Sequence, residues 1–237
     1  MPGLNESAAL RLAEPIVPQI INRLRQAIIE LKLEPGQPLS EKEIALLYGV
    51  SRQPVREAFI KLAEAGLVQV LPSRGTYVTK ISVKEVLNAR FVREAIECAV
   101  VREAATRIDS AGLDRLSGLI DGQMQAANRL DNVAFTELDE AFHRAIADCL
   151  DCDYAVRVVE AARTQTDRVR HLSLPEASPF PVLIEQHRQI VAALWARDPV
   201  AAEAAMRLHV REILSAIPRL AAAHPAYFED QGSLPLP

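Results

Sequence analysis

The sequence predicts a mainly α-helical protein whose N-terminal third also contains a small pair of β-strands. Apolar residues recur at three-and-four spacing through most of the chain, which is typical of helices with one buried face. Two short runs read as strands, Leu67–Leu71 and Thr76–Thr79, and they flank a turn at 72–75. From Val83 to about Leu220 no strand signal interrupts the helical pattern. We therefore expect two domains, at 15–80 and 83–220, the second of which is an antiparallel all-α helical bundle.

The composition is that of an ordinary globular protein, with 237 residues, 49% hydrophobic and 24% charged. No run of about 18 apolar residues is available to span a membrane, and the N-terminus lacks the residue order of a signal peptide, so we expect a cytoplasmic protein. Three cysteines are too few for a disulfide framework. Cys149 and Cys152 form a lone CxxC, which we interpret as accidental rather than metal-binding or redox-active.

The first domain is expected to follow a mobile leader at 1–14. An amphipathic helix is predicted over most of 15–33, followed by a turn at 34–38 that contains two prolines and a glycine. A short helix, Glu41–Leu47, should then begin behind Ser40, whose hydroxyl and the carboxylate of Glu43 form a capping-box pattern. Gly49 tolerates a left-handed backbone and should end this helix in a tight turn.

A second short helix should follow this turn, with Ser51 as its cap and with Val55 and Phe59 on its buried stripe. Arg52, Gln53 and Arg56 lie mostly off the stripe near the N-terminal end, where a recognition helix offers side chains to base edges. Arginine suits this place because its planar guanidinium can donate hydrogen bonds to O6 and N7 of one guanine at the same time. The residues expected to contact a DNA duplex are Lys42, Ser51, Arg52, Gln53 and Arg56 from the two helices, and Arg74 and Gly75 from the tip of the wing that the strands form.

Residues 15–80 resemble the winged helix-turn-helix domain of GntR-type transcription factors. The resemblance rests on five stretches: 33–39 (LEPGQPL), 40–43 (SEKE), 50–58 (VSRQPVREA), Gly66-Leu67 and Arg74-Gly75. It implies a DNA-binding domain. The alternative is a three-helix scaffold that binds protein and whose arginines are merely solvated.

The net charge of −4 is unevenly divided, since 1–82 carry +2 and 83–237 carry −6. A weak positive charge implies few phosphate contacts per chain, so useful affinity for DNA should require two copies on one site. We therefore expect a homodimer that binds two half-sites.

The second domain should consist of helices near 83–108, 112–129, 132–150, 154–171, 181–197 and 199–217. Asp131, Asp153 and Asp198 precede three of these segments and are expected to cap them. A loop is expected at 173–181, and a loosely ordered tail at 218–237.

Four polar residues violate the apolar pattern of this bundle. Asp139 and His143 are four residues apart and share one apolar helix face, and His187 and His209 each lie on the apolar stripe of another helix. A buried polar group without a partner costs ~1–3 kcal/mol, so four of them facing one core need a common explanation. A divalent metal would supply it, with zinc, nickel and manganese all compatible with this donor set. The alternative is that each histidine finds its own backbone carbonyl and that Asp139 pairs with His143.

The sequence around these four residues resembles the metal-binding effector (FCD) domain of FadR-subfamily GntR regulators. The matching stretches are 138–147 (LDEAFHRAIA), 186–190 (QHRQI) and Leu208-His209. The resemblance implies that Asp139, His143, His187 and His209 are the metal ligands. It also implies that Arg93, which lies on an apolar helix face four residues before Glu97, helps to hold an acidic effector. The alternative for Arg93 is an ion pair with Glu97 that fixes a helix interface.

Together these features predict a ligand-responsive transcription factor that acts as a repressor and homodimer. A small organic acid would bind at the metal and change how the two winged domains are spaced on DNA. One alternative is a metal-dependent enzyme, although no further nucleophile or second carboxylate is evident beside the four ligands. Another is a sensor in which the metal itself is the signal.

Overall fold

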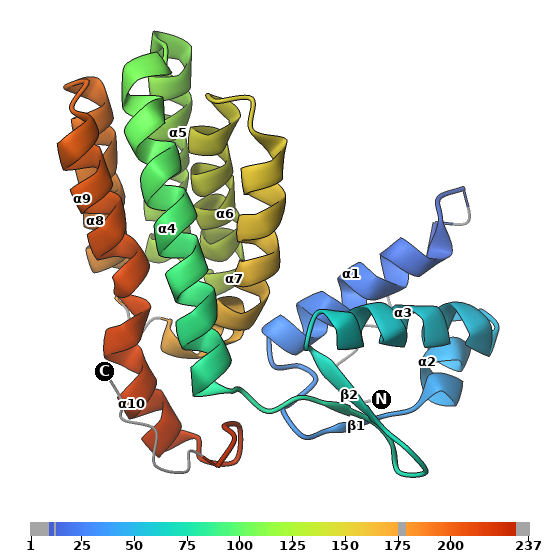
Figure 1. The fold of residues 1–237 in the computed structure, drawn as a ribbon. Coiled ribbons are helices and arrows are strands. Elements are labelled where there is room, and N and C mark those ends of the chain that lie inside the picture. The colour runs from blue at the N-terminus through green and yellow to red at the C-terminus, as the bar shows by residue number, and fades with distance from the viewer. Residues whose placement is uncertain (1–9, 12, 175–178, 231–237) are drawn as a thin grey trace. The chain divides into compact units, whose positions relative to one another are not determined.

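The computed structural model describes residues 10–11, 13–174 and 179–230, and it confirms the mainly α-helical fold class with a small wing (Figure 1). Its described residues divide into two compact units. The first, which we call the N-terminal unit, holds residues up to Glu85 and from Ala221 to Asp230, and the second, the helical unit, holds Val86–Leu220. Most of the predicted leader at 1–14 and the end of the predicted tail lie outside the described residues.

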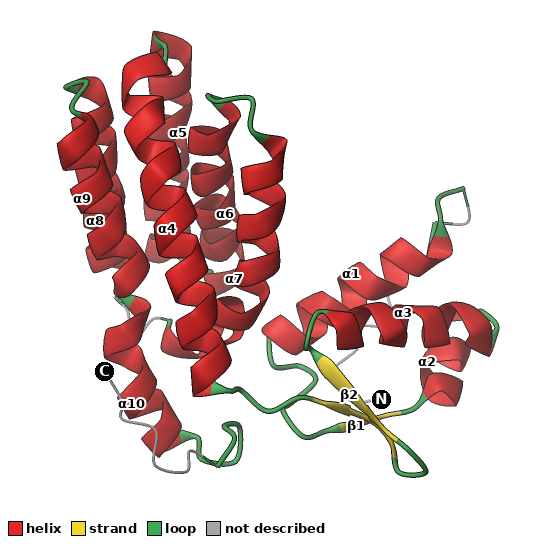
Figure 2. Cartoon of the chain, viewed as in Figure 1, coloured by secondary structure: helices red, strands yellow, loops and turns green. Residues whose placement is uncertain are grey.

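The N-terminal unit packs three helices against a three-stranded sheet (Figure 2). Its elements are α1 (Ile16–Ile29), β1 (Pro38–Leu39), α2 (Glu41–Tyr48), α3 (Arg52–Glu64), β2 (Val68–Leu71) and β3 (Gly75–Val78). The strand order is β1-β3-β2 and both pairings are antiparallel. Strand β1 was not predicted, because two residues are too short to show an alternating pattern. The core of this unit joins all three helices to the wing through Ile20, Leu24, Ile44, Val55, Phe59, Leu62, Leu67 and Val78.

The turn between α2 and α3 forms largely as the sequence predicts. The hydroxyl of Ser40 accepts a hydrogen bond from the amide of Glu43, 3.3 Å away, and Gly49 adopts a left-handed φ of 64°. The predicted hydrogen bond from Ser51 to α3 is wrong, although Ser51 does occupy the N-cap position. The third residue of α3 is Pro54, which has no amide hydrogen to donate to a cap.

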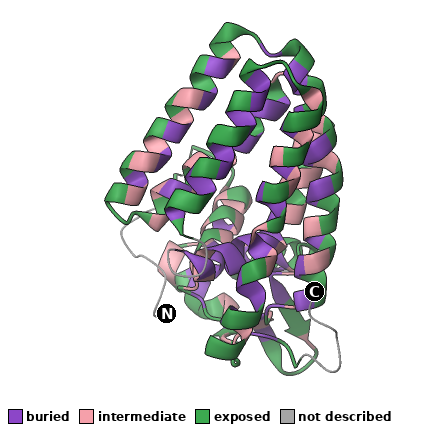
Figure 3. Ribbon diagram, turned by 90° about the vertical axis from the view of Figure 1, so that its left-hand side faces the viewer, coloured by how far each residue is buried: buried purple, intermediate pink, exposed green. Residues whose placement is uncertain are grey.

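The helical unit is built from α4 (Val83–Arg107), α5 (Ser110–Asn128), α6 (Asn132–Asp148), α7 (Asp153–Ser173), α8 (Phe180–Trp195) and α9 (Pro199–Arg211), followed by α10 (Ile213–Ala223). Figure 1 shows α4 to α9 side by side, and Figure 3 shows their buried residues on the inward faces. Asp131 and Asp198 cap α6 and α9 as predicted. Asp153 does not cap α7, because it is already the first helical residue and Cys152 takes the N-cap position.

The last predicted helix, 199–217, is wrong in its bounds. The helix is interrupted at Glu212, and α10 then continues to Ala223 with Pro218 inside it. Burial of apolar side chains such as Ile217 and Leu220 offsets the hydrogen bond that proline cannot make. The prediction of a loosely ordered tail is also wrong between α10 and Glu229, because this segment makes backbone hydrogen bonds. The amide of Ile81 donates to the carbonyl of Tyr227, and the amide of Glu229 donates to the carbonyl of Ile81. None of the helices formed by the described residues is long and apolar enough to cross a membrane.

Candidate metal centre and DNA-binding surface

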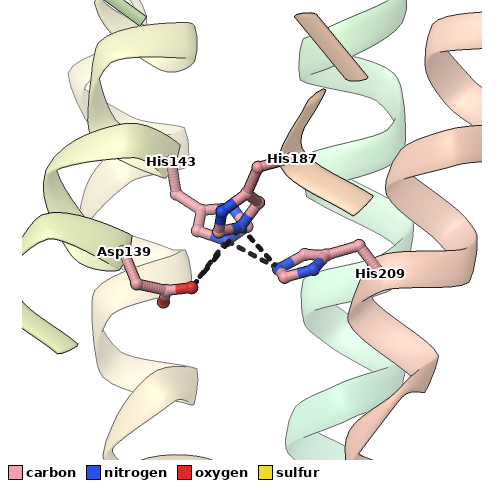
Figure 4. Close-up of side chains that lie close together, drawn as sticks. All are labelled: Asp139, His143, His187 and His209. Atoms are coloured by element: carbon pink, nitrogen blue, oxygen red, sulfur yellow. Dashed lines mark hydrogen bonds and ion pairs between the residues drawn. The ribbon is translucent and has the colours of Figure 1, made fainter. Parts of the chain in front are cut away.

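The structure brings all four predicted metal ligands together in the helical unit (Figure 4). Asp139 and His143 come from α6, His187 from α8 and His209 from α9. All four are buried, and one candidate ligand atom from each lies within 4.8 Å of the others. Their convergence follows from the helical spacing, since each residue lies on a face that packs into the common core.

The distances between the ligand atoms suit a single ion. Nε2 of His209 lies 3.1 Å from Nε2 of His143 and 3.3 Å from Nε2 of His187. Oδ1 of Asp139 lies 3.5 Å and 4.0 Å from the Nε2 atoms of His187 and His143. Two donors that are each about 2.1 Å from one ion at a tetrahedral angle lie roughly 3.4 Å apart. The four residues can therefore hold a metal ion without a large rearrangement.

The second nitrogen of each imidazole, Nδ1, contacts a side-chain oxygen. Nδ1 of His187 lies 2.8 Å from Oε1 of Gln123, and Nδ1 of His209 lies 3.1 Å from Oε1 of Gln186. Nδ1 of His143 lies 2.5 Å from a carboxylate oxygen of Glu97. An oxygen acceptor at this nitrogen favours the tautomer with its proton on Nδ1, so the Nε2 lone pairs of all three rings point toward one place.

Burial keeps these imidazoles neutral. Burial lowers the pKa of His187 to about 3 and the pKa of His209 well below its usual value. In both cases the carboxylate of Asp139 raises the pKa, but burial has the larger effect. Burial also lowers the pKa of His143, although Glu97 opposes the shift. Neutral imidazole is the form that binds metal.

Asp139 has two partners that the sequence analysis missed, Arg163 and Arg170 of α7. Nη2 of Arg163 donates to Oδ2 of Asp139 and Nη1 of Arg170 donates to Oδ1, each over 2.7 Å. Burial opposes ionisation of Asp139, but the two guanidinium groups outweigh it and hold the pKa of the carboxyl well below its usual range. The arginines are seven residues apart on one helix face, which is the only sequence signal that could have linked them.

Arg93 lies on α4 and is 1% exposed. It pairs with Glu97, as the alternative for this residue expects, and Nε donates to Oε1 over 2.6 Å. Its Nη1 lies 3.5 Å from the hydroxyl of Thr166, and its Nη2 has no hydrogen-bond partner among the described residues. Since Glu97 also contacts His143, a single carboxylate joins Arg93 to a candidate metal ligand.

The predicted DNA-contacting residues are all exposed and lie in the N-terminal unit. Lys42 lies on α2, Ser51 lies in the turn that follows, and α3 carries Arg52, Gln53 and Arg56. Arg74 lies in the turn of the wing, and Gly75 is the first residue of β3. An unpredicted contact joins two of them, because Arg52 and Arg56 both donate to the carboxylate of Glu41 on α2, over 2.8–3.2 Å. Hydrogen bonds from Arg56 hold the pKa of Glu41 below its usual value.

A winged helix-turn-helix in one unit and a helical bundle with a candidate metal centre in the other are the arrangement of a two-domain DNA-binding regulator. Residues 17–78 match the family described as bacterial regulatory proteins of the gntR family, and residues 89–212 match the FCD domain. The chain belongs to the GntR family, in the FadR-like subfamily that carries an FCD domain. Regulators of this family bind DNA operators, and the matched relatives are transcriptional regulators rather than enzymes.

Among the relatives is the HTH-type transcriptional repressor RspR of Escherichia coli K12, which is 41% identical over 222 residues, covering 94% of this chain and 97% of the relative. A regulator from an unstable DNA locus of Streptomyces ambofaciens is 37% identical over 90% of each chain. The structure of E. coli McbR/YncC has the same fold, with a TM-score of 0.74 at 21% identity over 89% of this chain and 99% of that one.

Proposed function

We propose that this protein is a homodimeric repressor whose operator affinity is controlled by a small organic acid bound at a metal centre. Repression is supported by the resemblance to RspR, which is named a repressor. Two copies are supported by the weak charge of +2 on 1–82, which leaves one chain few phosphate contacts. The proposed domains are 15–80 for DNA binding and 83–220 for effector binding and dimerisation. The proposed DNA contacts are Lys42, Ser51, Arg52, Gln53, Arg56, Arg74 and Gly75.

The observation that carries the metal proposal is the convergence of the Nε2 atoms of three buried imidazoles. Nε2 of His209 lies 3.1 Å from Nε2 of His143 and 3.3 Å from Nε2 of His187, and Nδ1 of each ring lies beside a side-chain oxygen. Lone pairs that face one another repel unless a cation lies between them. With Asp139 as the fourth ligand, zinc fits this donor set best, and nickel and manganese are compatible with it.

The effector site is proposed to combine this centre with Arg93. A bound divalent ion with a free coordination position would attract a carboxylate and accept one of its oxygens. The guanidinium of Arg93 can donate two hydrogen bonds to the same acid, as arginine commonly does to carboxylates.

Helix α4 is the proposed route from the effector to DNA. It begins at Val83, a few residues after the wing ends at Val78, and it carries both Arg93 and Glu97. If the acid binds more tightly when α4 is in one place than when it is in another, binding would favour the dimer arrangement that has α4 in the first place. The two winged domains would then be spaced differently for DNA.

Metal analysis and operator binding test this proposal together. The purified chain should contain about one metal ion per chain, and His187→Ala should lose most of it. A small acid should change operator affinity in the metal-loaded protein but not in the chelator-treated one. If His187→Ala retained the metal, the ligand assignment would be wrong.

A metal sensor is the second candidate, because four protein donors can hold an ion tightly enough for the ion itself to be the signal. Titration of operator binding with zinc alone separates the two functions. A sensor would respond fully to zinc, whereas an acid-responsive repressor would need both zinc and acid.

A further inference from the structure

A short C-terminal segment, 224–229, belongs to the N-terminal unit although it follows the last helix of the chain. The chain therefore passes between the two units twice, once within α4, after Glu85, and once within α10, after Leu220. Both matched family segments, 17–78 and 89–212, end before α10 begins. The C-terminal segment thus provides a second connection that neither of the two matched domains contains.

The C-terminal segment pairs with the linker between the wing and α4 as a short piece of parallel β-structure. The amide of Ile81 donates to the carbonyl of Tyr227 over 2.8 Å, and the amide of Glu229 donates to the carbonyl of Ile81 over 3.0 Å. Ile81 and Phe228, which face each other in this pairing, are both buried. We call the two hydrogen bonds and the two buried side chains the clasp, and both kinds of contact stabilise the paired arrangement.

Further contacts hold the segment beside the clasp. The amide of Tyr227 donates to the carbonyl of His224 over 3.0 Å, and the rings of these two residues stack with their centroids 5.6 Å apart. Burial raises the pKa of the Tyr227 hydroxyl, and the carboxylate of Glu34, which accepts a hydrogen bond from it, raises this pKa further. Because Glu34 precedes β1, the segment is fastened to the winged domain as well as to the linker.

The clasp restrains the linker, residues 79–82, near its middle. Thr79 at its start is tied to the wing, since its hydroxyl donates to the carbonyl of Gly66 over 2.7 Å. A hinge works by changing φ and ψ at a few residues of this kind. Both backbone groups of Ile81 are used by the clasp, so bending the linker there breaks two hydrogen bonds and uncovers Phe228. The clasp therefore opposes bending at the place where the winged domain joins α4.

We propose that the clasp fixes the linker so that the two winged domains of the dimer bind only half-sites of one spacing. This inference rests on the proposed function, because spacing matters only when two chains bind one operator. The second half-site is bound best when the connection between the two domains has the length and stiffness that the distance requires. A chain with an open clasp can bend at Ile81, so it loses more conformational freedom on binding but accepts other spacings.

Duplexes that differ only in their half-sites test the proposal. An operator selected in vitro with the full chain supplies the parent duplex. The other duplexes contain a single half-site, or have one or two base pairs inserted between the half-sites, and each inserted pair turns one half-site by roughly 35° about the DNA axis. The full chain should bind the parent duplex at least roughly tenfold more tightly than either spaced duplex, as measured by fluorescence anisotropy.

Two substitutions at neighbouring residues open the clasp in different ways. Phe228→Ala removes the buried side chain, and Glu229→Pro removes the amide that donates to Ile81. In both variants the preference for the parent spacing should fall to about threefold or less, while the affinity for the single half-site changes little. That affinity also shows whether the winged domain of each variant is folded.

Glu229→Ala is the matched control for Glu229→Pro. It removes the same exposed carboxylate, and it keeps the amide that donates to Ile81. The preference for the parent spacing should therefore stay at the level of the unaltered chain. If Glu229→Ala and Glu229→Pro lost the preference equally, the side chain rather than the backbone bond would be responsible, and the clasp inference would be overturned.

The remaining outcomes separate this inference from the proposed function. If the unaltered chain binds the parent duplex no more tightly than a single half-site, the proposed homodimer fails and this inference fails with it. If the unaltered chain prefers the parent spacing and both clasp variants keep that preference, only the clasp inference is overturned. Loss of half-site binding in both variants would also overturn it, since the clasp would then stabilise the winged domain itself rather than fix its spacing.

Discussion

Glu41 and Asp139 each pair with two arginines, and the two arginine pairs differ mainly in burial. Glu41, on the surface proposed to bind DNA, accepts hydrogen bonds from Arg52 and Arg56, whose side chains are 62% and 56% exposed. Asp139 in the candidate metal centre accepts hydrogen bonds from two arginines of α7, whose side chains are 4% and 7% exposed. The bond lengths are similar, at 2.8–3.2 Å and 2.7 Å.

The difference in burial decides what each pair can do. Water stabilises the exposed guanidinium groups, so they can exchange Glu41 for a phosphate or a base at little cost. The buried groups have no water to replace their partner, so they need an anion at all times. The same chemistry therefore gives an exposed pair of arginines that can change partners and a buried pair that cannot do so without a large cost.

The largest effect is expected on the stability of the helical unit when Asp139 is removed. Asp139→Ala should lower the free energy of unfolding of the helical unit by about 3–5 kcal/mol, because two buried guanidinium groups lose the carboxylate they hydrogen-bond to and Arg163 keeps only its longer contact with Asp167, at 3.9 Å. Urea unfolding of the chelator-treated protein can be followed by the fluorescence of Trp195, the single tryptophan, which ends α8 in the helical unit. Glu41→Ala is the exposed counterpart and should cost less than about 1 kcal/mol. Equal losses from the two substitutions would contradict the role given to burial.

The next effect concerns how the metal ligands are held. Gln123→Met removes the oxygen that lies 2.8 Å from Nδ1 of His187, so the ring loses the contact that fixes its tautomer. Zinc affinity should fall roughly 10–100-fold, as measured by competition with a chromophoric chelator. Gln125→Met is a matched control, since Gln125 lies on the same helix but is exposed. A similar fall in both variants would show that the contact at Nδ1 is unimportant.

The four candidate ligands could be predicted because each interrupts an otherwise apolar helix face. His187, for example, lies among Leu183, Ile184 and Val191, and all of these residues are buried. Helical periodicity reports which face is buried, so a polar residue on that face is visible in the sequence alone. The same reasoning located α2 and α3, whose apolar stripes and glycine turn are strong local signals.

The arginine partners of Asp139 could not be predicted in this way. Helix α7 is rich in charged residues, and its buried face holds Arg163, Asp167 and Arg170 rather than an apolar stripe. Their burial results from packing with other helices, which local sequence does not report. The contact between Glu41 and the arginines of α3 was missed for a related reason, because it joins residues 11 and 15 positions apart across a turn.

A smaller effect is predicted at the DNA surface. Glu41→Gln removes a negative charge beside Arg52 and Arg56, which should raise affinity for nonspecific duplex by roughly fivefold, the equivalent of about 1 kcal/mol. Affinity for an operator selected in vitro should rise less, so the ratio of specific to nonspecific binding should fall. Fluorescence anisotropy at several salt concentrations measures both affinities.

Glu57→Gln is the matched control for that charge change. Glu57 lies on α3 and bonds to Gln53, so its removal adds the same charge without releasing either arginine. If Glu57→Gln raised both affinities as much as Glu41→Gln did, only net charge would matter and Glu41 would have no part in orienting the arginines.

The smallest predicted effect is the contribution of the exposed pair to folding. A double-mutant cycle that combines Glu41→Gln with Arg52→Gln should give a coupling energy of about 0.2–1 kcal/mol in the free protein, since both side chains are solvated and screened by salt. Thermal unfolding at low and high salt measures this energy, and it should shrink at high salt. A salt-independent coupling above about 2 kcal/mol would mean that Glu41 holds its arginines as firmly as Asp139 does, so they could not be released to DNA at little cost.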